Sequence, residues 1–201
     1  MLYLPFLLLF AFSAFADDAE WDEPVIHDEP LRLFATPPVE PAPHITSRLT
    51  LDPATPWVAI TQCHRGMEPF PRVEVVYRYE RMRELRVTSS EKIDGTRVVG
   101  NSVQLDGVER NATLCVELEA AILHSDGDGG YRLHQGPYHR RFLDGWFPLR
   151  LTLEIRGGAL RITAMEPPPE PGLSLTQSEE GAVIEALFAG ELELDFRLVN
   201  R

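Results

Sequence analysis

Strict alternation of apolar and polar residues is the strongest pattern in this sequence. In the run LRLTLEIR at 149–156 every second residue is apolar, and the run ELELDFRL at 191–198 repeats the pattern. Because successive side chains of a strand point to opposite faces, this period of two indicates strands with one buried face and one solvated face. A helix would need a period of about 3.6 residues, and the sequence contains no long amphipathic helical stretch.

The same alternation recurs in two earlier runs, RVEVVYRYE at 72–80 and LCVELEAAIL at 114–123. Short strands of this kind, bounded by Gly-Gly and Asp-Gly turns at roughly ten-residue intervals, are typical of a β-sandwich or a barrel. One polar face on each strand favours antiparallel sheets that are half exposed to water. We therefore predict an all-β fold, an antiparallel β-sandwich, with a β-barrel as the alternative.

Two hairpins are expected from the turns between alternating runs. Gly157-Gly158 separates LRLTLEIR from the alternating LRITA, and Ala189-Gly190 separates AVIEALF at 182–188 from the last run. Glycine-containing turns between alternating runs favour tight β-hairpins. The segment AVIEALF is also the best candidate for a helix, although it is short for one.

Residues 1–16 are typical of a secretory signal peptide. Thirteen of them are apolar, none is charged, and Ala14-Phe15-Ala16 supplies the small residues that a signal peptidase recognises. A membrane-spanning helix needs about 20 apolar residues, and this run is shorter. We expect cleavage after Ala16 and no transmembrane segment in the mature chain. Every basic residue except Lys92 is arginine, which fits a GC-rich bacterial genome and favours a periplasmic location.

Acidic residues are concentrated at the two ends of the mature chain. The net charge of −12 comprises −7 in residues 17–43, +1 in 44–165 and −6 in 166–201. An acidic protein is repelled by phosphate backbones, so nucleic acid is not an expected partner. Proline recurs throughout 17–43. We predict an extended, acidic, Pro-rich lead segment there, followed by a single β-sandwich-like domain over 44–201.

The only two cysteines, Cys63 and Cys115, are expected to form a disulfide in an oxidising compartment. They enclose a loop of about fifty residues, for which the chain-entropy model gives a stabilisation of about 3–4 kcal/mol. Cys115 has the parity of the polar residues in its run rather than that of the apolar ones. We therefore expect a peripheral bridge near a sheet edge or a strand end, where Arg65-Gly66 interrupts the first strand.

The stretch TQCHRGMEPF also suggests a second use of its cysteine. Cys63, His64 and Met67 are soft donors of the type that copper or zinc sites use. On a continuous strand, however, adjacent side chains point to opposite faces, so Cys63 and His64 converge only if the strand has ended. Metal binding by these three residues is therefore the alternative to the disulfide, and no cofactor is expected.

The densest group of aromatic, basic and imidazole side chains lies in YRLHQGPYHRRFLDGWFPLRL, residues 131–151. Paired arginines next to aromatic rings bind carboxylates, phosphates and sugar faces, and loops at the end of a sandwich often carry such sites. The candidate binding residues are His134, Tyr138, His139, Arg140, Arg141 and Trp146. The alternative is a structural hairpin, with its aromatic rings in the core and its arginines paired with glutamates.

These observations predict an exported, non-catalytic binding or accessory protein of the bacterial envelope. Its partner, another envelope protein or a small anionic ligand, would be held by residues 131–147 or by an exposed sheet edge. Handling of copper or zinc in the periplasm is the alternative. Hydrolysis of an anionic envelope substrate through His139 and the arginine pair is a further alternative. No serine or cysteine stands in a triad or elbow context, so no catalytic residues are assigned.

Overall fold

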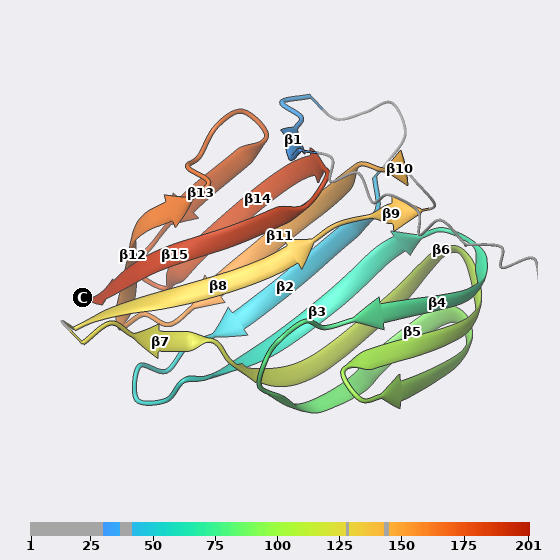
Figure 1. Ribbon diagram of the computed structural model, residues 1–201, viewed down its shortest axis with the longest axis horizontal. Coiled ribbons are helices and arrows are strands. Elements are labelled where there is room, and N and C mark those ends of the chain that lie inside the picture. Colours follow the sequence, from blue (N-terminus) through green and yellow to red (C-terminus); the bar gives the residue numbers. More distant parts are fainter. Residues whose placement is uncertain (1–29, 37–41, 128, 143–144) are drawn as a thin grey trace, which may run out of the picture.

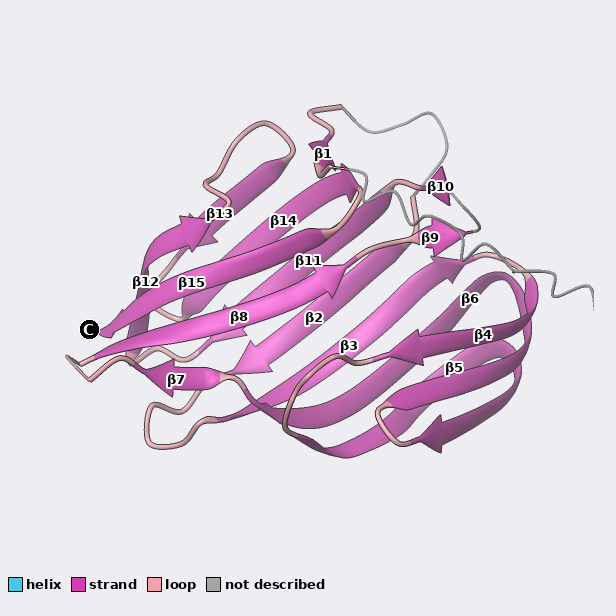
Figure 2. Ribbon diagram, viewed as in Figure 1, coloured by secondary structure: helices cyan, strands magenta, loops and turns pink. Residues whose placement is uncertain are grey.

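The computed structural model describes residues 30–36, 42–127, 129–142 and 145–201, and all regular elements of these residues are strands (Figure 2). In chain order they are β1 (Arg32–Leu33), β2 (His44–Thr50), β3 (Trp57–Met67), β4 (Phe70–Val76), β5 (Met82–Val99), β6 (Ser102–Ala121), β7 (Leu123–Ser125), β8 (Gly130–Tyr138), β9 (Arg141–Phe142), β10 (Gly145–Trp146), β11 (Leu149–Arg156), β12 (Leu160–Glu166), β13 (Leu173–Gln177), β14 (Gly181–Ala189) and β15 (Leu192–Asn200). The predicted signal peptide and most of the acidic lead segment lie outside the described residues. No helix in the described part of the chain is long and apolar enough to cross a membrane.

Nine of the strands form one large sheet. Its order is β1-β14-β11-β2-β3-β6-β4, with β13 beside β14 and β5 beside β6. Every pairing is antiparallel except that of β11 with β2. The long strand β6 pairs with β3 over residues 112–121 and with β4 over residues 102–108. Because β5 pairs along the other edge of β6, strands β3 and β4 lie end to end along the same edge.

A smaller sheet of four strands, in the order β12-β15-β8-β7, packs against the large one. Figure 1 shows it in front of β14, β11, β2 and β3, whereas the β4–β6 end of the large sheet extends beyond it. Strands β9 and β10 form a short ribbon that follows β8 in the chain. The predicted all-β sandwich is confirmed. The barrel alternative is wrong, because the described strands form separate sheets.

The core lies between the two sheets and follows the predicted alternation. On β6, Leu114, Val116 and Leu118 are at most 3% exposed, whereas the glutamates that alternate with them remain partly exposed. Phe188 of the large sheet and Phe196 of the small sheet are at most 1% exposed. Full burial of a large apolar side chain contributes about 1.5–3 kcal/mol, so this layer holds the two sheets together.

The prediction of two hairpins is wrong, because both turns are corners between the sheets. Gly157-Gly158 connects β11 of the large sheet to β12 of the small one, and Ala189-Gly190 connects β14 to β15. The helix candidate at 182–188 is part of strand β14. Alternation predicts which side chains face inward. Both sheets of a sandwich bury an inner face, so alternation does not predict which sheet a strand joins.

Cys63 and Cys115 form a disulfide, as predicted. They stand directly opposite each other in the pairing of β3 with β6, with their Cα atoms 4.1 Å apart. The expected location near a sheet edge or a strand end is wrong, because β5 pairs with the other edge of β6 at Cys115 itself. Both residues are partly exposed and alternate with buried ones, so the bridge lies on the outer face of the sheet, as the parity of Cys115 indicated.

Replacing both cysteines with alanine should lower the free energy of unfolding by about 3–4 kcal/mol, because the bridge constrains the unfolded chain between residues 52 positions apart. Urea unfolding of the mature protein, with and without dithiothreitol, measures the difference. The reduced wild type and the double variant should unfold at the same urea concentration. A double variant as stable as the oxidised wild type would show that the bridge contributes nothing.

Candidate functional site

A cavity of about 380 Å³ lies at the end of β8, between the two layers of the sandwich. One wall is the inner face of β2, β3 and β4, and the other is formed by residues 136–141. Its inner end is polar, since Gln62, Tyr77 and Tyr138 are at most 6% exposed. Ligand pockets range from about 300 to 1,000 Å³, so this cavity suits a small molecule.

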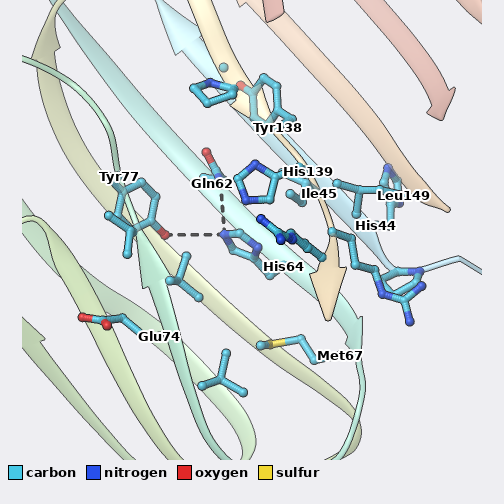
Figure 3. Close-up of a pocket in the computed structure, with 18 of the residues that line it drawn as sticks. His44, Ile45, Gln62, His64, Met67, Glu74, Tyr77, Tyr138, His139 and Leu149 are labelled. Atoms are coloured by element: carbon cyan, nitrogen blue, oxygen red, sulfur yellow. Dashed lines mark hydrogen bonds between the residues drawn. The ribbon is translucent and has the colours of Figure 1, made fainter. Parts of the chain in front are cut away.

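The alternation of β3 directs Gln62 and His64 into the cavity (Figure 3). A β-bulge then interrupts the pairing with β6 at Gly66, whose φ is 70°. The extra residue changes the parity of the strand, so Met67 lies on the same side as His64 despite the odd spacing. A residue with a side chain would be strained in this left-handed conformation, which explains the glycine.

His64 is an uncharged hydrogen-bond acceptor at neutral pH. Its Nε2 lies 3.0 Å from the amide nitrogen of Gln62 and 3.5 Å from the hydroxyl of Tyr77, and both groups can donate (Figure 3). With Nε2 accepting, the ring proton is on Nδ1. Burial lowers the pKa of His64 to about 4, so the ring is neutral at pH 7.

A second polar group lies at the end of β8 and is centred on Gln135, which is fully buried. Its side-chain oxygen accepts hydrogen bonds from the hydroxyl of Tyr138 at 3.0 Å and from that of Tyr79 at 3.4 Å. Its amide nitrogen donates to the carbonyl of His134 at 2.9 Å. Burial raises the pKa of Tyr79 to about 12 and also raises the pKa of Tyr138, so both remain protonated donors. These bonds tie β8 to the segment that follows β4.

Of the six binding residues predicted in 131–147, four line the cavity and two do not. The four that line the cavity are Tyr138, His139, Arg140 and Arg141. His134 is exposed on the outer face of β8, where its Nδ1 lies 3.0 Å from a carboxylate oxygen of Asp195. Trp146 packs edge-on against His139, with ring centroids 5.7 Å apart, and supports that ring rather than lining the cavity.

Arg140 is held in place by its own contacts. Its guanidinium forms an ion pair with Glu68 at 2.5 Å and donates to the carbonyl of Pro148 at 3.1 Å. It also lies over the ring of Phe147, with its central carbon 5.2 Å from the ring centroid, which is within the range of a cation–π contact. Arg140 therefore fixes the wall of the cavity, and its charge is neutralised by Glu68.

His139 lies near two further arginines. Burial lowers its pKa, Glu191 opposes this effect, and Arg78 and Arg141 add to it. The Nδ1 atom is 3.6 Å from a carboxylate oxygen of Glu191, which is too long for a hydrogen bond. His139 and the two arginines, which come from two parts of the chain, line the same cavity.

The alternative metal donors Cys63, His64 and Met67 are not brought together. Strand β3 continues through Met67, so Cys63 and His64 point to opposite faces, and the sulfur of Cys63 is bonded to Cys115. Within the described ranges, no group of three or more His, Cys, Asp or Glu side chains is placed to hold a metal ion.

The sequence prediction missed the polar inner end of the cavity. Gln62 and His64 have the same parity as Val58 and Ile60, which are at most 1% exposed. The available signal was that these two polar residues stand at inward positions of an alternating strand. A buried polar group needs a hydrogen-bond partner, so such residues indicate a polar site inside the fold. Nothing in the sequence indicated that Tyr77 would be that partner, since it lies beyond the end of the next strand.

No protein-family model matches this sequence, and no curated protein matches it. Similar solved structures include two of an M1 zinc metallopeptidase from Deinococcus radiodurans, one of them bound to a Tyr-Ser-Ala substrate, with TM-scores of 0.43 and 0.37. Both are 15% identical to this chain and cover 79% of it. The chain spans only 42% and 41% of those two chains, and a likeness at this level carries no argument about activity.

The lowered pKa of His64 predicts a loss of stability in acid. The imidazole has a pKa of 6.5 when it is exposed by unfolding, so between pH 6.5 and about 4 the unfolded chain binds a proton that the folded chain does not. The free energy of unfolding should therefore decrease as pH falls through this window, by about 3 kcal/mol in total, and this component should level off below it. Replacing His64 with glutamine should remove the component.

Urea unfolding at pH 7 and at about pH 4.5 measures this effect in the wild type and in the His64→Gln variant. The matched control is His124→Gln, at an exposed position of β7, which should keep the pH dependence of the wild type. The same pH dependence in all three proteins would contradict a neutral His64 whose pKa is lowered in the folded state.

Proposed function

We propose that this protein is an exported, non-catalytic binding protein of the bacterial envelope, which holds a small ligand in the cavity beneath residues 136–141. The cavity itself is the observation that supports this proposal. Four of the residues predicted for binding line it, together with the buried polar group around His64. Concave pockets in which a few polar groups converge on an apolar wall are typical of small-molecule sites.

The composition of the lining favours binding over covalent catalysis. Among the described residues that line the cavity there is no Ser, Thr, Cys, Asp or Lys. Covalent catalysis commonly uses one of these side chains or a glutamate, activated by a neighbouring base or by a lowered pKa. The two glutamates that line the cavity are engaged, Glu68 in the ion pair with Arg140 and Glu74 in a hydrogen bond from Ser102. The histidines that line the cavity, His44, His64 and His139, therefore have no Ser, Thr, Cys, Asp or Lys of the lining to activate.

The segment after β8 is better supported as the binding element than a sheet edge. The long edge strand β5 has three register shifts against β6, and both Glu84 and Lys92 adopt positive φ. Bulges and charged side chains on an edge strand hinder the addition of another strand. An extended partner would therefore find few regular backbone groups to pair with on β5.

Export supplies a separate prediction, motivated by the first sixteen residues and by the disulfide, which needs an oxidising compartment. Cells that produce the full-length chain should contain a periplasmic form that begins at Asp17. Intact-mass measurement of that form checks the cleavage after Ala16 and the loss of two hydrogens on bridge formation. Retention of an uncleaved chain in the cytoplasm would contradict the proposal.

Filling the cavity tests ligand binding. The uncharged dye N-phenylnaphthylamine fluoresces strongly in apolar surroundings and should bind the wild-type protein. Replacing Val75 or Met67, which both line the cavity, with tryptophan should weaken this binding about tenfold or more, because the indole occupies the volume that the dye needs. A fluorescence titration measures each dissociation constant.

The control for this test is Val183→Trp on β14, since Val183 is 38% exposed and does not line the cavity. It should bind the dye like the wild type, and thermal unfolding verifies that each variant is folded. Undiminished binding in both cavity variants, or no binding by the wild type, would count against a ligand cavity.

A further inference from the structure

We infer that the ligand is a small uncharged organic molecule with an apolar body, whose inner end carries both a hydrogen-bond donor and an acceptor, as a carboxamide does. The donor binds the side-chain oxygen of Gln62, and the acceptor binds the Nδ1–H group of His64. This inference rests on the function proposed above, because it assigns a chemical class to the occupant of the same cavity.

Gln62 offers a hydrogen-bond acceptor to the cavity. Its amide nitrogen is used in the hydrogen bond to Nε2 of His64, and Figure 3 shows its oxygen on the other side of the amide group. This oxygen forms no hydrogen bond with any described residue. Among the described residues, the side-chain atoms that are enclosed without a partner are Ser47 Oγ and His139 Nδ1. The oxygen of Gln62 is therefore not enclosed and can be reached from the cavity that Gln62 lines.

His64 offers a hydrogen-bond donor to the same cavity. Its Nε2 accepts from Gln62 and Tyr77, so the ring proton is on Nδ1. The Nδ1 atom has no hydrogen-bond partner among the described residues, and it is not one of the enclosed atoms either. Burial lowers the pKa of His64 to about 4, so the ring donates at neutral pH without carrying a charge.

These two atoms determine which group the inner end can accept. A ligand that enters displaces the water at both atoms. A group that only accepts leaves the oxygen of Gln62 unsatisfied, and a group that only donates leaves the Nδ1–H of His64 unsatisfied. An ionic group finds no counter-ion among Gln62, His64 and Tyr77 and loses its hydration on entry. An uncharged group that both donates and accepts satisfies both atoms.

The charged side chains of the lining do not favour an ionic ligand over a neutral one. They are Arg65, Arg78, Arg140, Arg141, Glu68 and Glu74. Arg140 forms an ion pair with Glu68, and the other side chains of this set are exposed to water. An additional ion gains little from charges that water already solvates. The inner end of the cavity, where water is displaced, therefore determines the chemical class of the ligand.

The wall of the cavity is suited to an apolar body. Met67, Val73 and Val75 line it and are only partly buried by the rest of the protein. A ligand body that covers these side chains removes their surface from water, which favours binding in proportion to the area covered. The volume of about 380 Å³ lies in the range of small-molecule pockets.

Three naphthalenes that differ in one group test this inference. Naphthamide carries a donor and an acceptor, methyl naphthyl ketone has the same shape but only accepts, and naphthoate is ionised at pH 7. Each is titrated against wild-type protein that holds N-phenylnaphthylamine, and the loss of dye fluorescence gives its dissociation constant. Naphthamide should bind about tenfold more tightly than the ketone, because the ketone leaves the oxygen of Gln62 unsatisfied. Naphthoate should bind more weakly than naphthamide, because its charge would be buried.

Variants assign these effects to the two residues. Replacing Gln62 with methionine removes the acceptor, so naphthamide and the ketone should then bind equally well. Replacing His64 with phenylalanine removes the donor, so both compounds should bind about tenfold more weakly. The matched control is Gln104→Met on β6, since Gln104 does not line the cavity, and it should bind all three compounds like the wild type. Thermal unfolding verifies that each variant is folded, and the comparison in the wild type decides even if a variant is not.

The outcomes separate the two proposals. If the ketone or naphthoate binds the wild type as tightly as naphthamide, or if folded Gln62→Met keeps the preference for naphthamide, the inference is wrong. The proposed function still stands in that case, provided that N-phenylnaphthylamine binds the wild type and Val75→Trp excludes it. If the wild type binds neither the dye nor naphthamide, the proposed function fails and the inference fails with it.

Discussion

The pairing of β6 with β3 and β4 determines where the side chains of the cavity point. Strand β6 has the whole of β5 on one edge and the end-to-end strands β3 and β4 on the other. A shift of one residue in this register would turn Gln62 and His64 toward solvent and their outer neighbours inward. The bridge between Cys63 and Cys115 opposes such a shift, because the two residues must remain directly opposite each other.

The inner end of the cavity is polar, although it lies between the two sheets of the sandwich. It holds neutral polar groups whose burial without hydrogen bonds would cost free energy. Gln62 and Tyr77 both hydrogen-bond to His64 there, so none of the three side chains lacks a partner. Gln135 and its two tyrosine partners then hold the end of β8 in position. The arginines that follow β8 are therefore presented from a hydrogen-bonded support, which limits the reorganisation needed to bind a ligand.

Much of the local structure could be predicted because it depends on short-range patterns. Alternation correctly predicted the inward faces of β6, β11 and β15, and the presence of only two cysteines in an exported chain predicted their bond. The two corners at Gly157-Gly158 and Ala189-Gly190 were predicted as hairpins, because a glycine-rich turn permits either geometry. The choice depends on which strands are already neighbours, and that information is not local.

The candidate site was also predicted only in part, because some of its features depend on local sequence and others on contacts between distant segments. Among the residues of 131–147, sequence composition alone singled out Tyr138, His139, Arg140 and Arg141, which line the cavity, but it also included His134, which faces outward. By itself, the sequence determined the all-β class, the inward parity of β6, β11 and β15, and the cysteine pair. Only the tertiary structure decided that the end of β8 lies over the inner face of β3, so that His139 and His64 line the same cavity. The physical reason is that strand period is a property of neighbouring residues, whereas the packing of one sheet on the other depends on contacts between distant segments.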